Sequence, residues 1–117
     1  MPIALKRAYA APSASDGCRI LVERLWPRGV LKQDAKIDLW LKEAAPSTEL
    51  RRWFGHDPTK WEEFKHRYFE ELRTRDQSLQ PIRERLRSGS VTFVFGSRET
   101  ELNSAVALKE YLAQGRP

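Results

Sequence analysis

The chain has 117 residues, of which 40% are apolar and 32% charged, a size and composition typical of one globular domain with one core. No segment has the roughly 18 uninterrupted apolar residues of a membrane span, and the N-terminus lacks the pattern of a secretion signal. We therefore expect a cytoplasmic protein without membrane contact. The single cysteine, Cys18, excludes an internal disulfide and a multi-cysteine metal site, and we expect it to be packed in the interior.

The net charge of +5 is concentrated near the N-terminus. Residues 1–36 contain seven basic and three acidic residues, whereas residues 37–117 contain fourteen and thirteen. This asymmetry favours an anionic partner, either a small phosphorylated or carboxylated molecule or a nucleic acid. A drift in composition that serves solubility alone would leave the same imbalance.

Two strands are predicted in the first quarter of the chain. Residues 3–9 form a short apolar and basic run, and a turn-rich stretch over residues 12–17 follows it. Residues 19–25 are too apolar for a strand with one face in solvent, so we expect this strand at the centre of a sheet. Pro27 ends it, and Gly29 permits a sharp exit of the chain.

Helical patterns dominate the middle of the chain. Residues 37–41 carry apolar residues at helical spacing and predict a short helical segment before Pro46. Ser47 is a favourable N-cap for the next helix, whose apolar stripe is Leu50, Trp53 and Phe54.

A long helix is predicted after Pro58, where Thr59 and Glu62 have the spacing of a capping box. Its apolar residues recur on one face, which we expect to be buried: Trp61, Phe64, Tyr68, Phe69 and Leu72. A shorter helix over residues 79–86 should end at Gly89.

Residues 91–95 read as a third strand, and residues 102–112 as an amphipathic helix that packs on the sheet. The element order predicts an α/β fold: a single small three-layer domain with a short, mainly parallel sheet of about three strands covered by helices. The helical crossover between the second and third strands favours their parallel pairing. The link between the first two strands is short, so that pair is either parallel or a hairpin.

Two arginines flank a Trp-Pro pair where the second strand should reach the surface of the sheet. The carboxyl ends of parallel strands share one edge, and open α/β folds bind ligands at that edge. Arginine offers a rigid fork of donors that matches carboxylate or phosphate. We predict an anion site whose donors are Arg24 and Arg28, with Lys32 as a mobile charge, Trp26 as an apolar wall, and Ser97 and Asn103 as polar partners.

The same arginines could instead serve the fold, by pairing with Asp38 or Glu43 and fixing the helical segment to the sheet. If the site performs chemistry, Asp38 or Glu23 is the candidate general base. The sequence assigns no catalytic residue, and whether the protein is an enzyme stays open at this point.

His56 and His66 are the two histidines of the chain. Asp57 could orient the imidazole of His56 for acid–base work, although Asp57 is equally explained as a helix start. His66 lies off the apolar face of its helix. Their spacing fits no metal site, and no cofactor-binding motif occurs, so we predict neither a metal nor a cofactor.

Seven blocks of this sequence carry a family resemblance, and the first, residues 19–29, contains the run Val-Glu-Arg-Leu-Trp-Pro-Arg-Gly. The others are residues 38–43, 45–51, 53–58, 64–72, 91–96 and 103–109. In this order they resemble the YeaO-like branch of the domain-of-unknown-function family 488 over nearly the whole chain. The resemblance implies a small bacterial or archaeal cytoplasmic protein with a parallel α/β arrangement, and it implies no particular activity.

Nucleic-acid binding is the main alternative. Four tryptophans among many arginines favour stacking on bases and contact with phosphates. Against this, Trp40, Trp53 and Trp61 fall on apolar stripes, and no recognised DNA- or RNA-binding signature occurs. The alternative is therefore a nucleic-acid-binding or regulatory protein-interaction module that uses the basic N-terminal surface, and the oligomeric state is left open.

Overall fold

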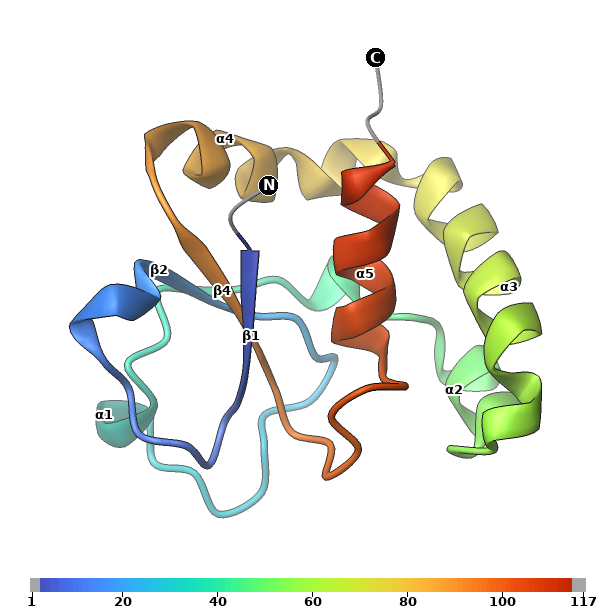
Figure 1. Ribbon diagram of the computed structural model, residues 1–117, viewed down its shortest axis with the longest axis horizontal. Coiled ribbons are helices and arrows are strands. Elements are labelled where there is room, and N and C mark those ends of the chain that lie inside the picture. The colour runs from blue at the N-terminus through green and yellow to red at the C-terminus, as the bar shows by residue number, and fades with distance from the viewer. Residues whose placement is uncertain (1–2, 115–117) are drawn as a thin grey trace.

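A four-stranded parallel sheet organises the chain (Figure 1). The computed structural model describes residues 3–114. The strands lie in the order β1-β4-β2-β3. Their bounds are Ile3–Arg7 for β1, Cys18–Leu21 for β2, Leu39–Trp40 for β3 and Val91–Phe95 for β4. The last strand in sequence is thus inserted between the first two, and it is parallel to both.

The predicted α/β fold with a mainly parallel sheet is confirmed, and the sheet has one strand more than expected. The parallel pairing of the predicted second and third strands is confirmed as the pair β2 and β4. A hairpin of the first two strands does not form, because β4 separates them. The second strand is shorter than predicted and ends at Leu21, although the Val22 N–H still donates to the Val94 carbonyl at 3.3 Å.

The prediction of a helix over residues 37–41 is wrong, because Leu39–Trp40 forms the edge strand β3. The Asp38 and Leu41 N–H groups donate to carbonyls of the β2 segment, each at 2.9 Å. Three apolar residues at helical spacing are a weak signal in so short a run, and pairing with an existing strand outweighs it.

Five α-helices complete the described fold: α1 (Lys32–Ala35), α2 (Thr48–Phe54), α3 (Trp61–Thr74), α4 (Gln80–Ser88) and α5 (Ser104–Ala113). As predicted, Ser47 caps α2, and its Oγ accepts from the Leu50 N–H at 3.2 Å. The predicted capping box at Thr59 is wrong, because Asp57 caps a 3-10 turn there and the Thr59 hydroxyl donates to Asp57. Helix α3 begins after that turn, at Trp61.

The two faces of the sheet are covered differently. In Figure 1, α3 and α5 lie to one side of the strands and α1 to the other. On the helix side, Ile20 and Phe93 pack with the buried faces of α3 and α5 into the main core. On the opposite side, Leu21 and Val94 are covered by a smaller group of partly buried residues: Trp26, Val30, Ile37 and Trp40.

A buried carboxylate joins the strands on this second face. Asp16 is 6% exposed, and its oxygens accept from Arg19 Nη1 at 2.7 Å and from Lys6 Nζ at 2.9 Å. The backbone carbonyl of Asp16 accepts from the Thr92 hydroxyl at 2.7 Å. Arg19 donates twice more to the Ala35 carbonyl, at 3.0 and 2.7 Å. The cluster therefore ties β1, β2, β4 and α1 together.

The environment of Asp16 favours its ionised form. Burial by itself would raise the pKa of this carboxyl, but hydrogen bonds from Lys6, the Ser13 backbone and Arg19 outweigh burial and hold the pKa well below its usual range. The ionised carboxylate is therefore a stabilising group, and its contribution is lost only in acid.

We expect Asp16→Asn to lower the free energy of unfolding at neutral pH by about 3 kcal/mol, because Arg19 would be buried without its charged partner. A depressed pKa gives stability that is complete above the unfolded-state pKa and is lost as pH falls toward the folded-state value. The difference between variant and wild type should therefore shrink below about pH 4. Urea unfolding at neutral and acid pH measures it, with the exposed Asp34→Asn as control. Equal stability of Asp16→Asn and wild type at neutral pH would contradict this role.

Candidate functional site

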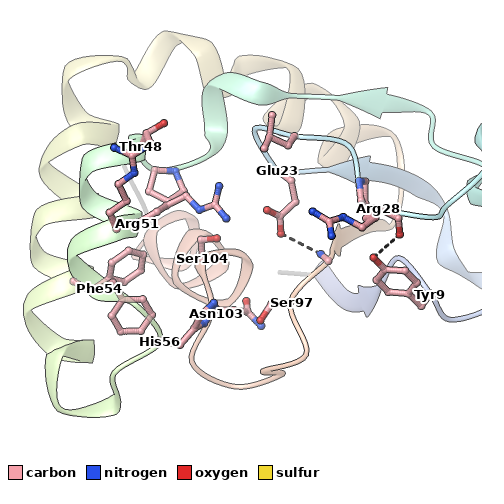
Figure 2. Close-up of a pocket in the computed structure, with 16 residues that line it drawn as sticks. Tyr9, Glu23, Arg28, Thr48, Arg51, Phe54, His56, Ser97, Asn103 and Ser104 are labelled. Carbon is pink, nitrogen blue, oxygen red and sulfur yellow. Dashed lines mark hydrogen bonds between the residues drawn. The ribbon is translucent and has the colours of Figure 1, made fainter.

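A cavity of about 510 Å³ opens where β2 and β4 end (Figure 2). Most of its lining comes from three segments that are far apart in sequence: the chain that follows β2, helix α2 with its flanking residues, and the chain from the end of β4 to the start of α5. Tyr9, after β1, and Phe64, in α3, complete it. Figure 2 shows Glu23 and Arg28 on one side of this cavity, with Arg51 and His56 on the opposite side. The volume lies within the usual range for small-molecule sites.

Three arginines line this cavity from two walls. Arg28 comes from the chain after β2, and Arg51 and Arg52 from α2. All three are exposed, and their side chains make no hydrogen bond or ion pair with any residue that the structure describes. Their donors are consequently available to a bound molecule.

Glu23 is the one carboxylate among the described residues of the cavity wall. Its Oε2 accepts from the Gly96 N–H at 3.1 Å, which links the chain after β2 to the end of β4. Burial raises the pKa of Glu23, while the Gly96 N–H, Arg51 and His56 act in the opposite direction. Arg51 therefore acts on Glu23 through space, without an ion pair.

Arg24 is not among the residues that line the cavity. Its Nη2 lies 3.4 Å from the Ala45 carbonyl oxygen and 3.3 Å from that of Pro46. Its Nε is buried and has no partner among the described residues. Arg24 thus supports the cavity wall from behind, through backbone carbonyls and not through Asp38 or Glu43.

The segment before α2 is held by side chains of α3 and of the turn that follows it. Arg75 Nη2 donates to the Ala45 carbonyl at 2.6 Å, and the Tyr68 hydroxyl donates to the Ala44 carbonyl. The Ser47 N–H donates to Glu71 Oε1 at 2.9 Å. These contacts fix where α2 begins, and therefore where its two arginines lie.

Ser97 and Asn103, both predicted as polar partners of a ligand, line the cavity. Asn103 is buried and caps α5, because its Oδ1 accepts from the Val106 N–H at 2.9 Å. Its Nδ2 donates to the Glu99 carbonyl at 2.7 Å, and Ser97 Oγ accepts from the Glu99 N–H at 3.0 Å. Both side chains also shape the turn between β4 and α5.

His56 lines the cavity as well and has a backbone φ of 58°, a left-handed conformation that is uncommon outside glycine. Asp57 does not orient its imidazole by a hydrogen bond. Instead, Asp57 Oδ1 accepts from the Thr59 N–H at 3.0 Å and from the Thr59 hydroxyl at 2.8 Å, and these bonds lower the pKa of Asp57.

Trp26, Lys32 and Asp38 are not among the residues that line this cavity. The Trp26 indole N–H donates to the Val30 carbonyl at 2.6 Å. The Trp26 and Trp40 rings pack edge to face, with their centres 5.5 Å apart. Lys32 is exposed on α1, and Asp38 Oδ2 accepts from the Arg19 backbone N–H at 2.9 Å. Trp26 covers the second face of the sheet together with Val30 and Ile37, so the chain that carries Lys32 and Asp38 also runs over that face and away from the cavity.

Sequence reasoning missed Arg51 and Arg52 as members of this site. A signal was present, because helical spacing places Thr48 and Arg51 on one face, beside the apolar stripe that begins at Leu50. The pattern of one helix does not say against which end of the sheet it packs, so the arginines could not be assigned to the cavity.

Much of the basic charge of residues 1–36 is used inside the fold. Lys6 and Arg19 bind Asp16, and Arg24 contacts backbone carbonyls. Arg7 donates to the Ser97 carbonyl at 2.9 Å and lies 5.0 Å from the centre of the Tyr9 ring. These contacts reduce the charge that the N-terminal surface presents to a nucleic acid.

Within residues 3–114, no helix is long and apolar enough to cross a bilayer, and no group of three or more His, Cys, Asp or Glu side chains is placed to hold a metal ion. Cys18 is half-buried and packs against the main core, and burial raises the pKa of its thiol.

The fold and its cavity define a small α/β protein with an arginine-lined candidate site at the carboxyl edge of a parallel sheet. A family model described as the inactive DUF488-N3 subclade matches residues 2–116. The Uncharacterized protein YeaO of Escherichia coli strain K12 is 38% identical over 112 residues, which cover 96% of this chain and 97% of that protein. The chain therefore belongs to the DUF488 family and is YeaO-like, as the sequence resemblance indicated.

Uncharacterized proteins of Mycobacterium bovis and Mycobacterium tuberculosis are each 36% identical over 110 residues, covering 94% of this chain and 92% of theirs. No solved structure shows a significant match to the chain.

We expect Glu23→Gln to raise the free energy of unfolding at neutral pH, because an amide oxygen can still accept from Gly96 without the cost of a half-buried charge. A carboxyl whose pKa is raised by folding binds its proton more tightly in the folded state, so stability falls as pH rises through the raised pKa. The gain in the free energy of unfolding should thus be present at neutral pH and vanish at about pH 4.

Thermal unfolding at these two pH values measures the effect, and the exposed Glu84→Gln on α4 is the control. A lower melting temperature of Glu23→Gln at neutral pH would show that the charge stabilises the fold.

Proposed function

We propose that this protein binds a small anionic molecule in the cavity at the carboxyl edge of its sheet. The observation that carries the proposal is the convergence of Arg28, Arg51 and Arg52 from two walls, where their side chains form no ion pair or hydrogen bond with the described residues. Guanidinium groups in this state suit carboxylate or phosphate, which they can bind through paired hydrogen bonds.

The remaining walls support the same function. Pro27, Pro46, Phe54 and Phe64 give the cavity apolar surface, against which the carbon frame of a small molecule can pack. The N-terminal turn of α5 lies at the cavity through Asn103 and Ser104, and the positive end of a helix dipole favours an anion there.

Binding without catalysis fits this cavity better than an enzyme. Glu23 and His56 are its candidate acid–base groups, and no hydrogen bond joins them to each other or to a nucleophile in the described structure. The family model that matches this chain is itself described as an inactive subclade, which favours a binding role over a catalytic one.

We expect Arg28→Ala and Arg51→Ala each to weaken the binding of inorganic phosphate or of succinate by about tenfold, the value of one charge-assisted hydrogen bond. Titration calorimetry measures it. Arg87→Ala removes an exposed arginine of α4 that lies outside the cavity, and it should leave affinity unchanged. Equal affinities of wild type and both cavity variants would remove this site from consideration.

The nucleic-acid alternative predicts a different result. If residues 1–36 formed the interface, the protein would retard DNA or RNA in gel electrophoresis at about 50 mM salt, and binding would weaken steeply at higher salt. Both cavity variants would then still retard the nucleic acid.

A further inference from the structure

An anion site built from arginines does not explain why Glu23 lines the same cavity. A carboxylate there repels a simple anion and lowers its affinity. Burial also makes its charge costly, which is why its pKa is raised. The position therefore suggests a partner that Glu23 meets only when the cavity is filled.

The hydrogen bonds of Glu23 leave room for such a partner. Oε2 is held by the Gly96 N–H at 3.1 Å, so the carboxylate has a fixed direction. Oε1 has no hydrogen-bond partner among the described residues, and the side chain points into the cavity in Figure 2. An acceptor of this kind is stabilised when a ligand donates a hydrogen bond to it.

The arginines of the cavity do not satisfy Glu23 either, because none of them forms an ion pair with it in the described structure. Arg51 acts on the carboxylate electrostatically, yet the two side chains form no ion pair. A carboxylate and an arginine thus face one cavity from opposite walls and remain apart. His56 lines the cavity on the same side as Arg51 (Figure 2).

We infer that the ligand is dipolar and carries both an anionic group and an ammonium group. The ammonium group binds Oε1 of Glu23, and the anionic group binds Arg51 with Arg28 or Arg52. The inference rests on the proposed anion-binding function and narrows its ligand class. The apolar surface of Pro46 and Phe54 then contacts the carbon spacer between the two ends.

Two pairs of probes test this inference, and the members of each pair differ by an ammonium or a methyl group in the same place. They are 3-aminopropylphosphonate with butylphosphonate, and 4-aminobutyrate with pentanoate. Wild type should bind the amino member of at least one pair about tenfold more tightly than its methyl partner, as titration calorimetry would show. The pair that shows the preference identifies the anionic group as phosphonate-like or carboxylate.

Glu23→Gln should abolish this preference, because it removes the charge while an amide oxygen can still accept from Gly96. It should also bind butylphosphonate at least as tightly as wild type does, since the repulsion is gone. Glu84→Gln should keep the wild-type preference. Glu23→Asp retains the charge and should still bind the amino probe more tightly than its methyl partner. If Glu23→Asp keeps this preference and Glu23→Gln loses it, the loss comes from the missing charge and not from a failure to fold.

Equal binding of amino and methyl probes by wild type would overturn the dipolar ligand while leaving anion binding intact. A preference that survives in Glu23→Gln would overturn the role of Glu23. Failure of all four probes and of inorganic phosphate would overturn the proposed function, and this inference with it.

Discussion

The position of β4 between β1 and β2 is the constraint on which the rest of the structure depends. All five residues of Val91–Phe95 are buried, and the strand is paired in parallel on both sides. Because its carboxyl end emerges beside that of β2, Gly96 meets Glu23 and the start of α5 reaches the same edge. A hairpin of the first two strands would have left no such meeting point. The cavity is therefore a product of strand order and not of one local motif.

Local signals predicted what local interactions decide. The strand Val91–Phe95 and the cap at Ser47 were readable because a β-branched run and a hydroxyl before a helix act over a few residues. The edge strand Leu39–Trp40 was missed because its partner lies in β2. At the site, Arg28, Ser97 and Asn103 lie in the segments that follow β2 and β4, so the order of the strands alone was enough to place them near the sheet edge. The positions of the α2 arginines depend on contacts of the preceding segment with Glu71 of α3 and with Arg75 after it, which no residue spacing reveals.

Two carboxylates of this fold differ in their hydrogen-bond partners and in the direction of their pKa shifts. Asp16 is enclosed by Lys6 and Arg19, and its pKa falls although burial opposes it. Glu23 receives one backbone hydrogen bond, and burial raises its pKa. The first arrangement is complete within the chain and holds three strands and α1 together. The second leaves Oε1 of Glu23 without a hydrogen-bond partner in the described structure, and a carboxylate with a raised pKa in a cavity is a candidate for a functional site.

The divergence of Glu23 and Arg24 limits how this protein can evolve. Glu23 lines the cavity, whereas Arg24 contacts backbone carbonyls outside it, so the insertion of one residue between Leu21 and Glu23 would move Glu23 to the position that Arg24 now holds. The carboxylate would then face the carbonyl oxygens of Ala45 and Pro46, where both partners are hydrogen-bond acceptors. The length of the segment from β2 to Glu23 is therefore more constrained than its composition.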